Sequence, residues 1–350
     1  MPNPYISVII LAHDRRKYLL DAVNSVLSQD FPRDKYEVLV VKYELDSDKE
    51  IDKKLEELGV RVINTKEVSL GAKIAVGAEE AKGKVLAFLE DDDLFLPGKL
   101  SRVYEVFKRD EKIGYYHNEM IYYDVDKNEE IKRDTEFRRK FILRFKRHFK
   151  DDLIIKGKDF WGKIPVISID FFAFNNSSIT IKKDVILSFN KVYKLSKFNY
   201  SIDHLHFILS LELGHLNVVD KKELTIYRVH SSSTMLKKYK DLEDYVKDII
   251  NITTVQIRNL LLPSMLYNLT NTEKFLTSIR YRVELTKYIY EEALGLKSNS
   301  HPFSIVIFLL RNDRSFIYSP GLFLPFVYAF LPSRLKREVL KRVFKHVNHT

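Results

Sequence analysis

Short apolar segments alternate with amphipathic ones along the first hundred residues, and this alternation limits the folds open to the chain. The pattern predicts buried strands at residues 5–11, 36–41, 60–64 and 84–89. It predicts helices at residues 15–29, 49–58, 71–82 and 100–109. Strands that alternate with helices indicate βαβ units, so we expect an α/β fold with a doubly wound, mostly parallel sheet. In such sheets ligands bind beyond the carboxyl ends of the strands.

The pattern becomes mixed after residue 109. Strands are predicted at residues 114–125, 166–174, 178–181 and 224–229, and a helix at 202–212. Residues 235–294 are mostly helical in character, with a break near Pro263, and the most apolar and most basic stretches follow. We therefore expect a catalytic domain at 1–232, a helical extension at 233–298 and an apolar-basic segment at 299–350.

An acidic run, Glu90-Asp91-Asp92-Asp93, directly follows the predicted strand at 84–89. Several carboxylates at a strand end cannot all ionise without a counter-charge. A divalent cation supplies that charge, and oxygen ligands suit Mg²⁺ or Mn²⁺, which usually share their ligands with substrate phosphates. The run therefore predicts a metal–phosphate site. The alternative is that Asp92 or Asp93 merely caps the helix after Pro97.

Composition excludes several classes of site. The 350 residues contain no cysteine, which rules out a disulfide scaffold, a thiolate zinc site, an iron–sulfur cluster and a cysteine nucleophile. Lys and Arg exceed Asp and Glu by 58 to 48, a net charge of +10 that favours anionic partners. The N-terminus has neither a basic region nor a small-residue cleavage site, so we expect a cytoplasmic protein.

Four segments of the chain resemble parts of one protein family. Residues 83–100 (GKVLAFLEDDDLFLPGKL) resemble the Asp-x-Asp region of family 2 glycosyltransferases, nucleotide-diphospho-sugar transferases with the GT-A fold. Residues 6–32 resemble that family's first strand, turn and helix, and residues 70–83 resemble the helix before the metal strand. Residues 201–233 resemble its acidic helix followed by a Tyr-Arg-x-His strand. The matches occur in the family's order over residues 5–233. The resemblance implies a GT-A-type α/β fold, in which a doubly wound mixed sheet is flanked by helices, with a C-terminal helical extension.

The resemblance implies a role for each matched position. Metal ligation is expected from Glu90, Asp92, Asp93 and His230. Donor or nucleotide binding is expected from Ala12, His13, Asp14, Glu44, Lys73, Asp91 and Arg228, and contact with sugar or acceptor from Asn175, Asn176 and Ser177. Asp203 matches the catalytic acid residue. It is the candidate general base in an inverting transfer of sugar from a nucleotide-sugar to an acceptor hydroxyl.

Structural interpretations of the same residues remain open. Asp14 and Asp203 could each be only a helix cap, and Asn175-Asn176 only a turn. His230 could be an ordinary histidine at a strand end.

The sequence departs from the family pattern in two places. The second strand is followed by Lys42-Tyr43-Glu44 where the family has paired acids, so the nucleotide base is left open. The register of the family's Arg-Asn holds Ile74 and Ala75, and Lys73 is the nearest cation.

Two basic regions predict contact with an anionic membrane surface. In residues 137–150 a phenylalanine recurs every four residues among seven Lys and Arg, and 303–345 joins an uncharged stretch to a basic helix. The alternatives are packing on the protein's own core or on a second copy, and, for the uncharged stretch, a true membrane span. We expect a peripheral position at the cytosolic face of the membrane and a glycan or lipid-linked acceptor. No nucleic-acid partner is expected, and a homo-oligomer is left open.

The sequence is also compatible with two other functions. A nucleotidyltransferase shares the metal–phosphate requirement, but residues 13–16 contain none of the glycines of a phosphate loop. A non-catalytic membrane or nucleic-acid binding protein of the same fold is the second rival.

Overall fold

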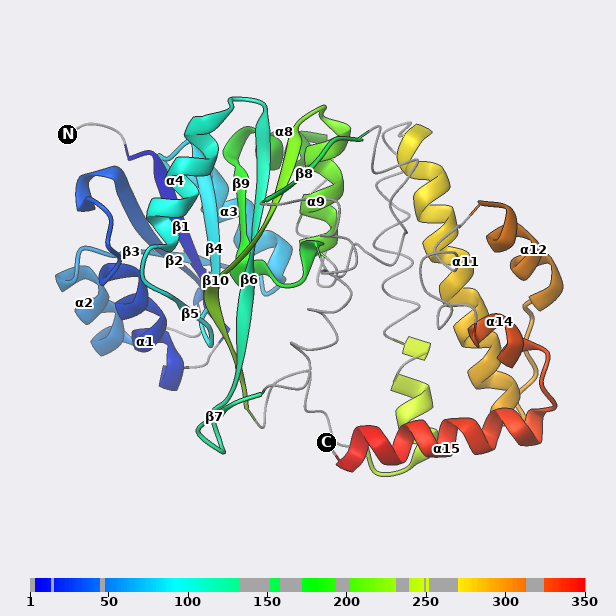
Figure 1. Cartoon of the computed structure of the whole chain (residues 1–350). Coiled ribbons are helices and arrows are strands. Elements are labelled where there is room, and N and C mark those ends of the chain that lie inside the picture. The colour runs from blue at the N-terminus through cyan, green and yellow to red at the C-terminus, as the bar shows by residue number, and fades with distance from the viewer. Residues whose placement is uncertain are drawn as a thin grey trace. The chain divides into compact units, whose positions relative to one another are not determined.

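The structure, a computed structural model, divides the chain into two compact units (Figure 1). The first comprises Met1–Lys158 and Ile169–Ser233, and the second comprises Asp159–Ser168 and Thr234–Thr350. The residues that the structure describes are 4–13, 16–44, 48–131, 152–157, 172–192, 195, 202–230, 239–248, 250–251, 270–312 and 324–349.

A single mixed sheet forms the centre of the first unit. Its strands are ordered β3-β2-β1-β4-β9-β6-β10-β5, with β7 paired to β6 and β8 to β10. The four parallel strands of the first half are β1 (Ile6–Leu11), β2 (Tyr36–Tyr43), β3 (Arg61–Thr65) and β4 (Val85–Glu90). The others are β5 (Leu94–Phe95), β6 (Ile113–Asp124), β7 (Glu129–Glu130), β8 (Leu153–Ile155), β9 (Ile179–Lys182) and β10 (Leu216–Val229). Strand β9 is antiparallel to both β4 and β6, and β10 runs parallel to β6. The predicted α/β fold with a mixed sheet is confirmed.

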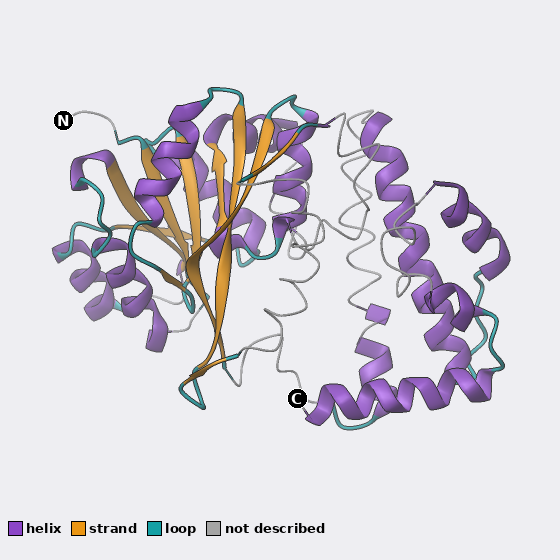
Figure 2. Ribbon diagram, in the orientation of Figure 1, coloured by secondary structure: helices purple, strands orange, loops and turns teal. Residues whose placement is uncertain are grey.

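Helices cover both faces of this sheet (Figure 2). Strands β1, β2 and β4 are apolar on both faces, which is what a sheet buried between helices requires. One face packs on α1 (Arg16–Leu27), α2 (Lys49–Glu57) and α4 (Lys99–Arg109). The other packs on α3 (Leu70–Glu80), α8 (Lys183–Val192) and α9 (Ile202–Glu212). Helix α9 contacts β6, β9 and β10.

Some local predictions need correction. Strand β10 begins at Leu216, eight residues before the predicted start at 224. Of the predicted strand at 166–174, residues 166–171 lie outside the described residues, and Phe172 and Ala173 are helical. The N-cap of α4 is Gly98, which has a φ of 82° and makes no side-chain cap. The interpretation of Asp92 or Asp93 as a cap for this helix is therefore wrong. Asp203 lies inside the first turn of α9, so it is not the N-cap either.

The second unit is helical in its described parts. It contains α11 (Thr270–Ala293), α12 (Pro302–Asn312), α14 (Leu324–Ala329) and α15 (Ser333–His349). Apolar side chains of α11, α12 and α14 form one cluster, and α11, α15 and residues near Tyr245 form another. Among the described helices, none is both long and apolar enough to cross a bilayer. The basic stretch at 137–150 lies outside the described residues.

Candidate active site

Four acidic residues occupy the carboxyl end of β4, at the edge of the sheet where α/β proteins bind ligands. Glu90 is the last residue of the strand and is half-buried. The side chains that follow are almost fully covered, with relative exposures of 0% for Asp91, 7% for Asp92 and 1% for Asp93. Buried carboxylates need partners, and three different segments of the chain supply them.

Asp93 is held between β10 and the turn before β9. Its Oδ1 accepts the main-chain N–H of Arg228 at 3.0 Å, and its Oδ2 accepts the Asn175 side-chain amide at 3.2 Å. Burial and then the charge of Glu90 raise the pKa of Asp93 to about 7, although hydrogen bonds from Ser177 and Arg228 oppose the shift. Both oxygens of this carboxyl group are thus already engaged.

Asp92 contacts the end of β10 through His230. The Nε2 of His230 lies 3.1 Å from Asp92 Oδ2, and the imidazole ring lies 4.9 Å from the ring of Tyr18 on α1. Arg228 donates its Nε to the Asp92 carbonyl, and its Nη1 to Asp21 Oδ2 at 3.0 Å. The guanidinium also covers the face of Tyr18 at 4.7 Å. Arg228 therefore joins the acidic turn to α1.

Asp91 contacts the end of β1. Its Oδ2 accepts the main-chain N–H of His13 at 2.6 Å. Lys73, buried on α3, donates to the Ala12 carbonyl at 2.5 Å and lies 3.2 Å from His13 Nδ1. The ends of β1 and β4 and a cation from α3 are thereby connected.

The Asn175–Ser178 turn contacts Glu90. The Glu90 N–H donates to Ser177 Oγ at 3.0 Å, and the Asn176 amide donates to Glu90 Oε1 at 3.3 Å. The side chain of Asn175 caps the short helix η4 (Asn176–Ser178) by accepting the Ser178 N–H. The residues thus form a turn, as the structural interpretation held, and they also contact the acidic run.

Lys99 was missed by the sequence analysis. This first residue of α4 is fully buried, and its Nζ donates to the Ser177 carbonyl at 2.5 Å and to Thr225 Oγ1 at 3.0 Å. Burial lowers the pKa of Lys99, and the nearby charge of Asp93 opposes that shift. The positive end of the helix dipole repels a lysine at a helix N-terminus. A lysine at this position is therefore a sequence signal that could have indicated a buried partner.

The structure brings most of the predicted residues together. The contacts above join Ala12, His13, Lys73, Glu90, Asp91, Asp92, Asp93, Asn175, Asn176, Ser177, Arg228 and His230. Asp14 lies outside the described residues, and Glu44 is exposed at the end of β2. Asp203 is half-buried, and its charge adds to burial in raising the pKa of Tyr115. No hydrogen bond between described residues links Glu44 or Asp203 to the acidic run.

The donor set can provide part of a metal shell. No group of three acidic or histidine side chains suited to a metal occurs among the described residues. Asp92 and His230 nevertheless converge, and the half-buried Glu90 lies two residues before Asp92 in the chain. Mg²⁺ is commonly held by one or two carboxylates and completed by substrate phosphates, so these residues fit an ion that arrives with a diphosphate.

Comparison with known proteins assigns the domain. The model of glycosyl transferase family 2 matches residues 7–175, which include β1–β4, the acidic run and the turn at Asn175. The chain carries a family 2 glycosyltransferase domain. A segment of 116 residues of this chain is 34% identical to an uncharacterized glycosyltransferase of Nostoc sp. and covers 32% of the chain and 36% of the relative. The chain therefore matches about a third of that relative's length.

Two solved structures share the fold of this chain. The Staphylococcus aureus protein TarS, residues 1–349 in complex with UDP-GlcNAc, superposes with a TM-score of 0.57 at 15% identity, over 99% of this chain and 91% of that one. The mannosyltransferase PcManGT from Pyrobaculum calidifontis, in complex with GDP-Man and Mn²⁺, gives a TM-score of 0.53 at 12% identity, over 96% and 87%. At these identities the likeness shows that the chain has the GT-A fold.

Proposed function

We propose that this protein transfers a sugar from a nucleotide-diphospho-sugar to an acceptor hydroxyl, with inversion at the anomeric carbon. The observation that carries the proposal is the buried acidic turn at the carboxyl end of β4 in a family 2 domain. Its surroundings supply cations as well as carboxylates, namely Lys73, Lys99 and Arg228. The nucleotide-sugar complexes of TarS and PcManGT support the choice of donor class.

Asp92, His230 and Glu90 are the proposed ligands of a divalent metal, Mg²⁺ or Mn²⁺. The Mn²⁺ of PcManGT supports this assignment. When bound, the ion would offset the charge that develops on the leaving diphosphate. The engaged oxygens of Asp93 favour a different role for that residue, which is to fix Asn175 and the main chain of Arg228 around the turn.

Asp203 is the proposed general base. It is half-buried in the first turn of α9, a helix that contacts β6, β9 and β10. Because an ionised carboxylate can accept the proton of an attacking hydroxyl, its position on the face opposite the leaving group would give inversion. Asp203→Asn should lower kcat by about 10²–10⁴-fold while the KM for the donor changes little. A retained anomeric configuration in the product, read by NMR, would overturn the inverting mechanism.

Nucleotide binding tests the donor site directly. The experiment measures thermal stabilisation of the protein by UDP, GDP, dTDP and CDP, each with and without Mn²⁺. One nucleotide should stabilise the wild type in a metal-dependent way, and Asp92→Asn should abolish the effect. Asp34→Asn, an exposed aspartate on the turn before β2, is the matched control and should behave as wild type. Failure of all four nucleotides to stabilise the wild type contradicts the proposed donor class.

An anionic membrane surface is the proposed partner of the second unit, where a lipid-linked acceptor would be met. Helix α15 exposes Arg334, Arg337, Lys341, Arg342 and Lys345 against the single acid Glu338. Large apolar side chains are exposed on the same unit, among them Phe303, Phe330 and Leu335, with relative exposures of 67%, 54% and 50%. Exposed apolar groups beside a basic helix are typical of a surface that binds at a lipid headgroup layer.

A further inference from the structure

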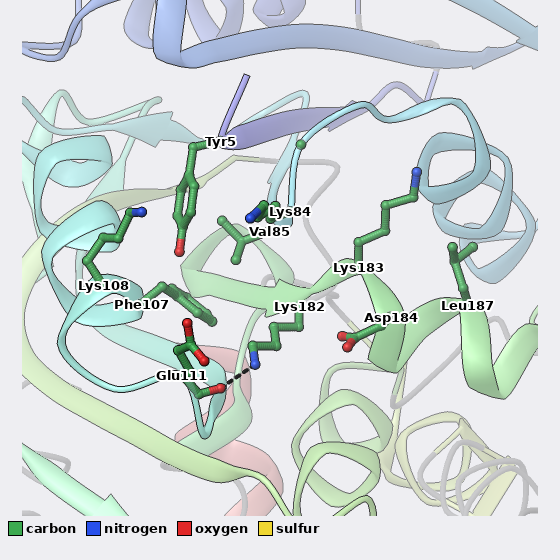
Figure 3. A pocket seen from close by; sticks show the side chains of 11 residues that line it. Tyr5, Lys84, Val85, Phe107, Lys108, Glu111, Lys182, Lys183, Asp184 and Leu187 are labelled. Atoms are coloured by element: carbon green, nitrogen blue, oxygen red, sulfur yellow. Dashed lines mark hydrogen bonds between the residues drawn. The ribbon is translucent and has the colours of Figure 1, made fainter. Parts of the chain in front are cut away.

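A cavity of about 580 Å³ lies in the first unit at the amino ends of β1 and β4 (Figure 3). It is bounded by Tyr5 before β1, by Gly83, Lys84 and Val85, by Phe107, Lys108 and Glu111 at the end of α4, and by Lys182, Lys183, Asp184 and Leu187 at the junction of β9 and α8. Four elements distant in sequence thus contribute to one space. None of these residues belongs to the acidic turn or to its partners.

Positive charge dominates the lining. It contains four lysines and two carboxylates, and among the described residues none of the six forms an ion pair. Lys182 donates to the Glu111 carbonyl, Lys183 donates to the Ala81 carbonyl, and Lys108 lies 4.8 Å from the centre of the Tyr5 ring. Three of the four lysines therefore contact neutral groups, and the four lysines outnumber the two carboxylates of the lining. The first turn of α8 opens on the same cavity, and helix N-termini favour anions.

The remaining lining matches a polyhydroxylated ring. Tyr5 projects into the cavity beside Phe107, and the carboxylates of Glu111 and Asp184 lie around the same space in Figure 3. Carboxylates accept hydrogen bonds from hydroxyl groups, and aromatic faces pack against the apolar side of a ring. An inorganic anion would use only the lysines, whereas a sugar that bears an anionic group would use all three kinds of side chain.

The cavity is separate from the candidate active site. Val85 lines the cavity at the start of β4, and Glu90 is the last residue of the same strand. The two sites therefore lie at opposite ends of the strands. Five residue steps at the strand rise of ~3.3 Å place them about 16 Å apart along β4. A ligand of the size of one sugar cannot reach both.

We propose that this cavity is a second binding site, specific for a sugar that carries a phosphate or carboxylate group. Lys84, Lys108 and Lys182 would hold the anionic group, Glu111 and Asp184 the hydroxyls, and Tyr5 the ring. The ligand is either a free sugar phosphate or one residue of an acidic glycan chain. The site does not depend on the proposed transfer reaction, because it shares no residue with the donor site.

Acetylation of lysines, read residue by residue by mass spectrometry, tests this site without any activity measurement. The probes are glucose 1-phosphate and hexagalacturonate, with glucose as the uncharged control. At a probe concentration ten times the dissociation constant, the acetylation rates of Lys84, Lys108 and Lys182 should fall about tenfold, as simple occupancy requires. Lys53, whose side chain is 79% exposed on α2, should not be protected.

A pair of matched variants completes the experiment. Lys84→Gln combined with Lys108→Gln should weaken protection of Lys182 by the probe. Lys53→Gln combined with Lys54→Gln makes the same change in charge on α2 and should leave protection intact. Whichever probe protects at the lower concentration identifies the free sugar or the chain as the ligand. Absence of protection by both probes, equal protection by glucose, or protection unchanged in the Lys84/Lys108 variant would overturn the proposal.

Discussion

Lys99 connects three parts of the candidate active site from a fully buried position. Its ammonium group donates to the Ser177 carbonyl and to Thr225 Oγ1, and its charge acts on Asp93. Lys99→Met keeps most of the side-chain volume but leaves these acceptors without their donor. Buried polar groups that lose a partner cost about 1–3 kcal/mol, so we expect a loss of that size in the free energy of unfolding.

Denaturant unfolding of the two variants provides the measurement. Lys108→Met changes an exposed lysine at the other end of α4 and should stay within about 0.5 kcal/mol of wild type. Equal stability of Lys99→Met and Lys108→Met would show that the contacts of Lys99 contribute nothing.

His206 predicts how stability depends on pH. The imidazole is fully buried on α9 and stacks on Phe88 at 5.1 Å, and neither ring nitrogen has a hydrogen-bond partner among the described residues. Burial lowers the pKa of His206 from 6.5 to about 3. Between pH 6.5 and pH 3, His206 therefore binds a proton in the unfolded chain but not in the folded chain. The free energy of unfolding falls as the pH drops through this range. Between pH 7 and pH 5 this contribution is about 2 kcal/mol.

The check is the slope of unfolding free energy against pH in His206→Phe. That variant keeps an aromatic ring against Phe88 and should lose the contribution, so its stability should fall less between pH 7 and pH 5. His301→Gln, at an exposed position, should keep the wild-type slope. A slope in His206→Phe identical to wild type would contradict the assignment.

The candidate site could be predicted from the sequence where its residues are adjacent or follow a strand. The acidic run after 84–89 is of this kind. The contacts of Tyr18 and Asp21 with Arg228 could not be predicted, because they join residues about 207 positions apart and depend on how α1 lies against β10. The role of Asp203 stays a prediction.

At the scale of elements, the close approach of β1 to the start of β4 depends on Gly83. A Cβ at this position would lie 2.6 Å from the main-chain nitrogen of Ser7 and 2.8 Å from the carbonyl carbon of Ile6. Backbone atoms cannot move aside cheaply, so Gly83→Ala should force the strands apart and destabilise the protein by about 1–3 kcal/mol.

Gly214→Ala supplies the comparison for this substitution. Gly214 has a φ of 80° with no atom within 4 Å of an added Cβ, so alanine there meets backbone strain without a clash. Amide hydrogen exchange, measured by mass spectrometry, should be faster in β1 and at the start of β4 only in Gly83→Ala. Equal exchange rates in the two variants would contradict the packing argument.

Elements with a strong local period were predictable, and those defined by pairing were not. Strands β1, β2 and β4 are apolar on both faces, and helices α1, α2 and α4 show one apolar face, so local sequence suffices for them. The middle of β10 is the charged stretch 220–223, which includes a register shift between Val219 and Glu223, and the strand forms through pairing with β6 on both sides of the shift and with β8 at its start. Strand β5 has two residues and exists only through its contact with β10.

At the scale of the whole molecule, the charge of α15 predicts salt-sensitive binding to anionic vesicles. The triple variant Arg337→Gln, Lys341→Gln, Arg342→Gln removes three exposed cations. At about 1 kcal/mol per residue near a charged membrane surface, partitioning should weaken by roughly 100-fold. Flotation with phosphatidylserine-containing liposomes measures this.

A charge-matched control separates local from net charge. Lys53→Gln, Lys54→Gln, Lys66→Gln removes three exposed lysines from the first unit, and it should float as wild type. If both triple variants bind equally, or if the wild type does not float, α15 is not the binding surface.

Strand β9 has a consequence for how the central sheet unfolds. It is four residues long, and of the described strands it alone pairs with both β4 and β6. Residues Ile179–Lys182 therefore connect two halves of the sheet. One half ends in the acidic turn, and the other carries Arg228 and His230 at its end. Loss of the β9 pairing would separate the acidic turn from Arg228 and His230. The site and the sheet should therefore unfold in one cooperative event rather than by fraying from an edge strand.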